Sequence, residues 1–287
     1  MVVNGCDCSI VIKTTHKETD IPYSDETLRE AVSLFEEEPC IEGNGIKRAM
    51  PKTSGITGCV VTPLTIKTAP LLLYLAMGFF GKPVFISMTN NLYKHNLNLL
   101  PMEDTECFDL IQDRVTERRI YENCRIKGFE LRIMREETIK LKLEITGHGK
   151  PKTYTLAENC DREAGERFNG DFVTFKINGK EYKNIYGFTL VCMKESGTRT
   201  EIWIKRVLQK DNEIPSIIEE LNINARLIRD KYESNYLGAF HITLKNLVLI
   251  SDETEINTSG AVISPIRYYV SGSVSCEVYT CGNGEIA

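Results

Sequence analysis

Alternating apolar and polar residues mark two neighbouring segments near the middle of the chain. In FELRIM (129 to 134) and TIKLKLEITG (138 to 147), every second residue is apolar and most residues between them are charged. This period of two is typical of strands with one buried and one solvated face. Because the polar residues 135 to 137 separate the two segments, the sequence predicts an antiparallel pair of strands.

Runs rich in β-branched and aromatic residues predict further strands. Asn178-Gly179, between two such runs, is the strongest hairpin signal in the chain. The further predicted strands are 8–14, 58–66, 83–88, 173–182 as a hairpin, 188–193, 200–208, 240–250, 261–270 and 273–280. We therefore expect a mainly β fold, a β-sandwich or barrel with short helices.

The most apolar stretch is TAPLLLYLAMGFFGK, residues 68 to 82. A membrane-spanning helix needs roughly 20 apolar residues, so this stretch is too short to span a bilayer. Pro70 suits the first turn of a helix and Gly78 suits its C-terminal cap. We expect a short helix whose residues Leu72 and Leu75 are buried against strands of the same subunit.

Two other helices and one long loop are expected. Ser24 is a plausible N-cap for a helix through about Phe35, and Pro215 opens a segment in which Ile218 and Leu221 fit a buried helical stripe. The full stripe is Ile217, Ile218, Leu221, Leu227 and Ile228. Residues 36–57 combine glycine, proline and charge without periodicity, which predicts a loop of a length that is usually functional or disordered.

The predicted elements follow the same order twice. A strand, a helix and a strand precede a terminal pair of strands both in 58–147 and in 200–280, and a boundary falls within 148–171. This order predicts two tandem β units, 1–150 and 151–287, each capped by one helix. Residue identity between the halves is negligible, so a coincidence of element order stays open as the alternative.

Composition narrows the classes of function. The chain has 287 residues, of which 42% are hydrophobic and 26% charged, as in an ordinary globular protein. Its formal net charge of -5 and pI of ≈ 5.6 argue against a broad basic surface that grips nucleic acid. A channel through which DNA merely passes is compatible with this charge.

Motifs of catalysis or metal binding are lacking in the sequence. There is no GxGxxG, GxxxxGK[ST], HExxH or GxSxG, and neither Cys6-x-Cys8 nor Cys276-x4-Cys281 is followed by a second CxxC or a histidine pair. We expect no catalytic residues, no cofactor, no metal site and reduced thiols. The start, MVVNGCDCSIVIK, has no long apolar segment behind basic residues, so no secretion signal is expected.

Several segments resemble the tail tube proteins of long-tailed bacteriophages. In that family a strand leads into a short leucine-rich helix that ends in glycine, and a tyrosine-Gly/Asn-Cys element precedes two long strands. The segments that carry the resemblance are TPLTIKTAPLLLYLAMG, KHNLNLLP, YENCRIKGFELRIMREETIKLKLEITG, FKINGKEY, FHITLKNLVLI and GAVISPIRYYVSGSVSCEVY. The resemblance covers most of residues 53 to 280 and rests on the order of the elements and on the glycine and proline residues that bound them.

The resemblance implies a structural virion protein without enzymatic activity. It would be made in the cytoplasm of a host bacterium and would join other tail proteins, with no part in a membrane. Its subunits would form stacked rings around a channel for DNA, without sequence-specific DNA binding. A subunit with two repeats would form a trimeric ring with pseudo-sixfold symmetry, whereas one with a single repeat would form a hexamer.

The long loop is a candidate arm between rings in this interpretation. Its glycines and dispersed apolar residues have little means of folding alone, so we expect the adjacent ring to order them. The candidate residues of this inter-ring interface are Ile41, Gly43, Gly45, Ile46 and Met50. Strands of neighbouring subunits would meanwhile pair laterally into an inner barrel.

A β-sandwich recognition module, such as a baseplate or receptor-binding accessory component, is the alternative from another class. A purified monomer with a concave aromatic groove would favour it, whereas rings or tubes that form with rising concentration would favour the tube subunit. An enzyme ranks third because many folds assemble active sites from distant residues that no motif reveals.

Overall fold

The protein is mainly β in this computed structural model. Helix α1 spans Ala69–Met77, and two 3₁₀ helices, η2 and η3, span Met102–Asp104 and Gly170–Phe172. The structure describes residues 9–15, 17–36, 49–79, 82–87, 91–114, 117–149, 151–154, 165–195, 197–207, 213–228, 236–252, 255–256 and 262–281.

The strands run through the whole described chain. They are β1 (Ser9–Lys13), β2 (Glu18–Ile21), β3 (Asp25–Glu26), β4 (Arg29–Glu36), β5 (Ala49–Pro63), β6 (Val84–Ser87), β7 (Leu92–Asn98), β8 (Phe108–Arg114), β9 (Glu117–Met134), β10 (Lys140–His148), β11 (Lys152–Tyr154), β12 (Val173–Ile177), β13 (Lys180–Glu181), β14 (Ile185–Met193), β15 (Arg199–Val207), β16 (Ile217–Ile228), β17 (Tyr236–Asp252), β18 (Glu255–Ile256), β19 (Val262–Val270) and β20 (Val274–Cys281). The expectation of a mainly β fold is confirmed.

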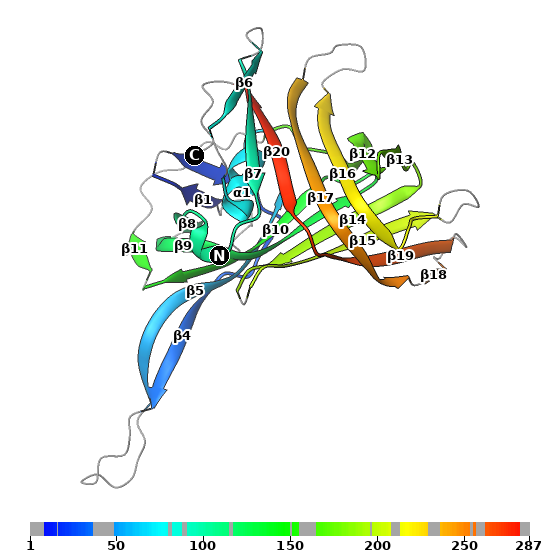
Figure 1. Ribbon diagram of the computed structural model, residues 1–287. Helices are drawn as coiled ribbons and strands as arrows, with labels where there is room; N and C mark the ends of the chain where they lie inside the picture. The colour runs from blue at the N-terminus through cyan, green and yellow to red at the C-terminus, as the bar shows by residue number, and fades with distance from the viewer. Residues whose placement is uncertain are drawn as a thin grey trace.

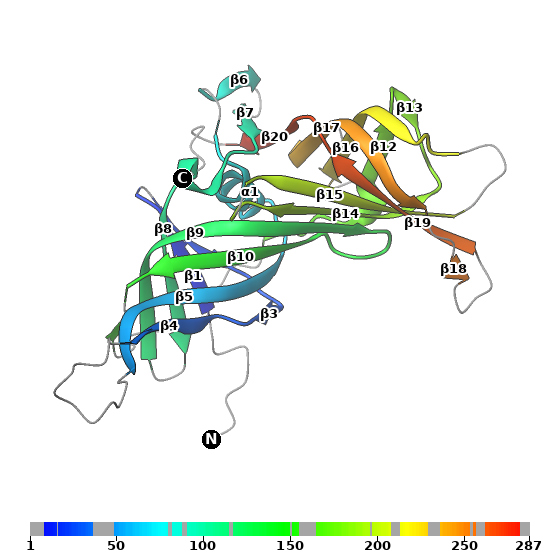
Figure 2. The same ribbon diagram turned by 60° about the horizontal axis from the view of Figure 1, so that its bottom comes forward.

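Eight of these strands form one continuous antiparallel sheet. Their order is β4, β5, β10, β9, β14, β15, β19, β17. Figure 2 shows β5, β10, β9, β14 and β15 side by side along this sheet. The pairing of β9 with β14 joins the two halves of the chain, and buried apolar residues of both halves form a single cluster.

Strand β9 pairs with different strands along its two halves. Its first half pairs with β8 and β11, whereas its second half pairs with β10 and β14. Between the halves, Asn123 has a φ of 54°, in the left-handed region that asparagine tolerates. Four residues later, Lys127 is the extra residue of a β-bulge opposite β10. These two irregularities let one long strand pass from one sheet into another.

Strand β17 has the same two irregularities at the same spacing. Its first half pairs with β20 and its second half with β19, while β16 pairs along its other side. Asn246 has a φ of 56°, and four residues later Ile250 is the extra residue opposite β19. Both long strands therefore change partners at a left-handed asparagine followed by a bulge.

The pairing scheme around β9 recurs around β17. Strand β8 pairs with β1 of the β1–β2 hairpin, and β16 pairs with β12 of the β12–β13 hairpin. Likewise β10 pairs with β5 of the β4–β5 hairpin, and β19 pairs with β15 of the β14–β15 hairpin. Helix α1 and strands β6 and β7 lie in the first half of the chain and have no counterpart among the described elements of the second half; β7 pairs with β20.

Helix α1 lies in the middle of the molecule against β9, β7 and β20 (Figure 1). It has Pro70 in its first turn and ends at Gly78, whose φ is 109° and whose N–H donates to the carbonyl oxygen of Tyr74 at 2.8 Å. Leu72 and Leu75 are 0% and 1% exposed. The expectation of a short helix buried against strands of its own chain is confirmed.

The prediction of a helix after Pro215 is wrong, because this segment is strand β16. Asn178 of the β12–β13 turn accepts hydrogen bonds at its Oδ1 from the backbone N–H groups of both Glu219 and Glu220, each at 3.0 Å. The alternation of buried and exposed residues in β16 is interrupted at this point, and Ile218 and Leu221, three residues apart, are both buried. That spacing imitates a helical stripe, whereas Ile217 of the expected stripe is 67% exposed.

The helix expected from Ser24 is also wrong, because β3 and β4 occupy this segment. The expected loop 36–57 is wrong where it is described, because its residues from Ala49 onward belong to β5. Glycine conceals this strand in the sequence: a Cβ at Gly55 would lie 2.3 Å from the carbonyl oxygen of Gly147 in β10. Here glycine marks the close approach of two strands rather than a loop.

Candidate functional site

The sheet edges stand out as places where another chain could bind. Strands β3 and β4 pair with β5, and no described strand pairs along their other side. Strand β17 pairs with β16 as far as Val248, and the N–H of Leu249 donates to the carbonyl oxygen of Ser216 at 3.0 Å; from Ile250 onward, β17 and β18 pair with β19 on one side alone within the described residues. Backbone groups on such edges can pair with a strand from a second molecule.

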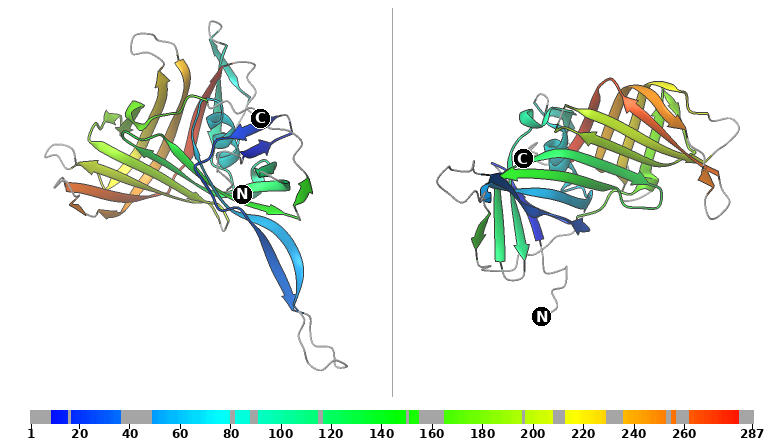
Figure 3. Two further views of the ribbon diagram at one scale, coloured as in Figure 1. Left: turned by 180° about the vertical axis from the view of Figure 1, so that it is seen from behind. Right: turned by 90° about the horizontal axis from the view of Figure 1, so that it is seen from below.

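The β4–β5 hairpin projects from one end of the molecule (Figure 1 and Figure 3, left). Its backbone pairs run from Arg29 opposite Thr57 to Glu36 opposite Ala49. Of the expected inter-ring residues, Met50 lies in β5 with its backbone opposite Phe35. The others, Ile41, Gly43, Gly45 and Ile46, lie outside the described residues.

An apolar edge strand lies at the opposite end of the molecule. Val84, Phe85 and Ile86 of β6 are 46%, 43% and 50% exposed, and the ring of Phe85 packs edge-on against Tyr93 of β7. Three consecutive exposed apolar side chains on an edge strand are typical of a contact surface. The sequence signal was present in PVFISM, but it does not distinguish a buried strand from an exposed one.

The residues expected to pack a helix have two different roles. Leu72 and Leu75 are in α1, whereas Ile218 and Leu221 pack the same hydrophobic cluster from β16. The structure therefore brings all four into one core and supports a structural role for each.

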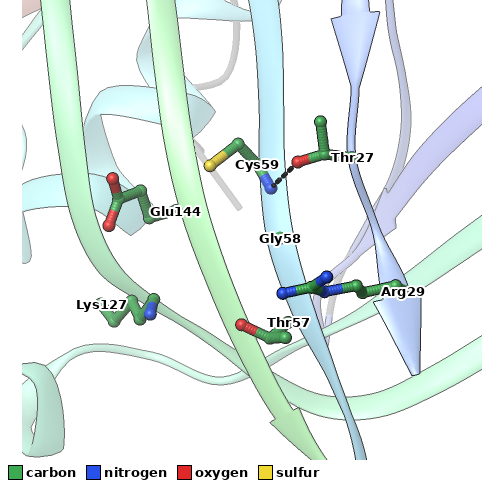
Figure 4. A pocket seen from close by; sticks show the side chains of 7 residues that line it. All are labelled: Thr27, Arg29, Thr57, Gly58, Cys59, Lys127 and Glu144. Carbon is green, nitrogen blue, oxygen red and sulfur yellow. Dashed lines mark hydrogen bonds between the residues drawn. The ribbon is translucent and has the colours of Figure 1, made fainter. Parts of the chain in front are cut away.

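An open depression of ≈ 530 Å³ lies where β3 gives way to β4 (Figure 4). Gly58 shapes it: its φ is 150°, and a Cβ there would lie 2.4 Å from the carbonyl oxygen of Thr27. Thr27 is held by two hydrogen bonds with the backbone of Cys59, at 2.9 and 3.0 Å. The lining residues are Thr27, Arg29, Thr57, Gly58, Cys59, Lys127 and Glu144. They include one carboxylate, that of Glu144, together with the amine of Lys127 and the thiol of Cys59.

A charged cluster lies on the same sheet at β15 and β19. Glu201 accepts hydrogen bonds from Arg199 at 2.6 Å and from Nε of Arg267 at 2.9 Å, and Arg267 lies over the ring of Trp203. Burial raises the pKa of the Glu201 carboxyl, but the hydrogen bonds from Arg267 and Arg199 outweigh burial and hold this pKa below its usual value. The cluster has the composition of a structural ion-pair network.

Ligands for a metal do not come together in the part of the chain that the structure describes. No three histidine, cysteine, aspartate or glutamate side chains there form a group that could hold a metal ion. Of the described helices, none is long and apolar enough to cross a membrane.

Three of the described cysteines are buried thiols. Burial raises the pKa of Cys124 to about 12 and that of Cys192 to about 11, and it also raises the pKa of the Cys276 thiol. Cys59 and Cys107 are half-buried. Since the thiolate is the reactive form, the three buried thiols are poor nucleophiles.

We expect iodoacetamide at pH 8 to leave Cys124, Cys192 and Cys276 unmodified in the folded protein. The same thiols should react fully in denaturant, because unfolding returns their pKa values to the ordinary range. Peptide mass spectrometry reads each site, and Cys59 is the internal control for an accessible thiol. Rapid alkylation of Cys124 before unfolding would contradict its burial.

Comparison with known proteins adds no family to this geometry: no protein-family model matches the chain, and no curated protein matches it. The described residues instead define strand edges, a projecting hairpin and an exposed apolar strand as the candidate contact surfaces.

Proposed function

We propose that the chain is a tail tube subunit of the kind found in long-tailed bacteriophages, which assembles into stacked rings around a channel for phage DNA. The repeat of the pairing scheme carries this proposal. Strands β4, β5, β10 and β9 form one set of four, and β14, β15, β19 and β17 form a second set with the same connections. Two tandem units, 1–150 and 151–287, account for this repeat even though the second set has no described helix between β15 and β16.

The junction between the two sets supports a way for such units to join. Strand β9 of the first set pairs with β14 of the second over residues 128 to 134 and 187 to 193. An equivalent junction between chains would use the outer sides of β17–β18 and β3–β4. This contact joins unlike surfaces, so it closes into a ring if the rotation per subunit allows it.

Three chains would bring six four-stranded sets to one ring. A trimer with pseudo-sixfold symmetry is therefore the favoured assembly, and a hexamer is the other possibility. The strands of neighbouring chains would then form one continuous inner barrel, in which every outer edge of the eight-stranded sheets is paired.

The face of the sheet opposite α1 would line the channel. Along β9 and β10 this face alternates in charge, with Glu130 and Glu144 among the basic residues Arg132, Lys140 and Lys142. A mixed surface of this kind offers no continuous basic stripe for the DNA backbone. It suits passage of DNA without sequence-specific binding, in keeping with the net charge of -5.

Contacts along the tube would use the two ends of the molecule. The β4–β5 hairpin and the exposed strand β6 lie at opposite ends of the molecule (Figure 1 and Figure 3, left). Unlike contact surfaces at opposite ends generate open filaments when they bind each other. Other tail proteins would cover the two ends of the finished tube. In this function the protein has no enzymatic activity and no cofactor, is made in the host cytoplasm and resides in the virion tail.

Negative-stain electron microscopy of the purified full chain tests the proposal. We expect rings, and tubes of stacked rings, whose number rises with protein concentration. Mass photometry of the smallest ring should give three or six times the mass of the 32.6 kDa chain. A protein that stays monomeric at all concentrations, with an intact thermal unfolding transition, would overturn the proposal.

The exposed strand β6 favours one alternative, a recognition module of a baseplate or receptor-binding accessory component. Val84, Phe85 and Ile86 could bind a strand of another protein through backbone pairing and apolar contact. Such a module would remain a monomer in the microscope, so the same experiment separates the two functions.

A further inference from the structure

The register of the junction between β9 and β14 is a template for the same kind of strand pairing between two copies of the chain. Gly128 lies opposite Met193 and Met134 lies opposite Gly187, and the N–H of Lys194 donates to the carbonyl oxygen of Lys127 at 2.8 Å. The bulge residue Lys127 therefore sits at the start of the junction. The corresponding bulge residue of the second set is Ile250 in β17.

We infer that β17–β18 of one copy pairs antiparallel with β3–β4 of the next copy, with Ser251 opposite Ala31. This inference rests on the proposed ring assembly and specifies its lateral contact. The occupant of each sheet edge is thus a second copy of this chain, and the internal junction is the template for the contact between copies.

Two rows of paired residues across the sheet set this register. The first row, starting after the bulge of β9, is Gly128, Glu144, Cys59 and Thr27. The second row, starting after the bulge of β17, is Ser251, Arg267, Trp203 and Thr189. Thr27 therefore holds the place in the first set that Thr189 holds in the second.

Thr189 pairs across the internal junction with Arg132, four residues beyond Gly128. Met193, four residues beyond Thr189, lies opposite Gly128 in the same junction. Ala31, four residues beyond Thr27, holds the place of Met193, and Ser251 holds the place of Gly128, so the template brings Ala31 opposite Ser251 of the next copy. A shift by one residue is excluded because it would turn every side chain to the opposite face, and the matching position of the two bulges selects this register.

Side-chain charges are compatible with this register. Glu30 lies opposite Asp252 of the next copy, and two acidic residues in direct opposition would repel each other. Each has an arginine of its own chain nearby: Arg119 lies 4.0 Å from Glu30, and Arg206 lies 3.4 Å from Asp252. These arginines offset the acidic charges at the contact.

The pair Ser251 and Ala31 is well placed for a cross-link. In the internal junction, the hydrogen bond between Lys194 and Lys127 makes the next pair, Gly128 and Met193, a non-hydrogen-bonded pair. The Cα atoms of such pairs lie about 4.5 Å apart, which is within the range of a disulfide. The same geometry is expected between Ser251 and Ala31 of two copies.

The test uses the full chain with the double substitution Ala31→Cys and Ser251→Cys. After assembly and mild oxidation with copper phenanthroline, we expect the protein to shift from the monomer band to linked dimers and a closed trimer on a non-reducing gel. Reductant should reverse the shift, and peptide mass spectrometry should identify the 31–251 disulfide among the native cysteines. A mixture of the two single variants should give dimers and no higher species.

The matched control is Arg29→Cys with Ser251→Cys, which moves one cysteine two positions along β4. It should link far less than the first pair, because the Cα atoms are then too far apart. If rings form but the control links as well as the first pair, or the 31–251 disulfide is absent, the register is wrong while the tube function stands. If the unmodified chain forms no rings, the tube function and the register fail together.

Discussion

Replacing Leu75 by alanine is expected to lower the free energy of unfolding by about 2–5 kcal/mol. Leu75 is 1% exposed on α1, which lies between β9, β7 and β20. The truncation removes apolar contacts and leaves a cavity that a helix held on several sides cannot easily close. Urea unfolding, followed by circular dichroism, measures the change in midpoint and slope.

Val84→Ala is the matched control for this prediction. Val84 is 46% exposed on β6, so the same kind of truncation should change the unfolding free energy by no more than about 0.5 kcal/mol. An unchanged urea midpoint for Leu75→Ala would show that α1 contributes little to the core.

Local patterns predicted the elements whose own residues determine their structure. The strict alternation of 138–147 became β10, and Asn178-Gly179 became a hairpin turn with φ values of 48° and 79°. Pro70 and Gly78 marked the ends of α1 because a helix terminus depends on residues within the same few positions.

The failures occurred where distant residues decide the structure. The segment after Pro215 reads as a helix because Ile218 and Leu221 are buried three residues apart, at a point where Asn178, more than 40 positions earlier, accepts a hydrogen bond from the N–H of Glu219. The start of strand β5 reads as a loop because Gly55 fits against β10, a contact that no local window contains. Long-range strand pairing overrode local propensity in both cases.

The contact surfaces were the least visible part in the sequence. The β9–β14 junction follows from pairing between residues that are remote in the chain, and the exposure of β6 follows from its place at an edge. The prediction of two tandem units relied on a repeated order of elements that included a helix after Pro215. The described structure has no helix there. The repeat of strand pairing now supports the same proposal on independent grounds.

The projecting hairpin leads to a prediction about tube length. A deletion that tests this segment must stop before Ala49, because a longer one, such as 42 to 56, would remove residues of β5 that pair with β4. Removing residues 39 to 46 instead leaves four residues between Glu36 and Ala49, a connection length that antiparallel strands tolerate. A protein without these residues should keep its thermal unfolding transition, since the described pairs of β4 and β5 remain.

We expect this deletion variant to form isolated rings and no long tubes. The deletion removes Ile41 and Ile46, the apolar residues proposed to dock on the adjacent ring, while the lateral edges β17–β18 and β3–β4 stay intact. A variant of full length, with residues 39 to 46 replaced by glycine and serine, is the control for loop length; it should also fail to stack, because ordering a flexible segment costs about 1–2 kcal/mol per residue without apolar contacts to offset it. Tube lengths in negative stain measure the effect. Tubes of normal length from the deletion variant would refute the axial role of the hairpin, and a loss of the thermal transition would place residues 39 to 46 in the folded core instead.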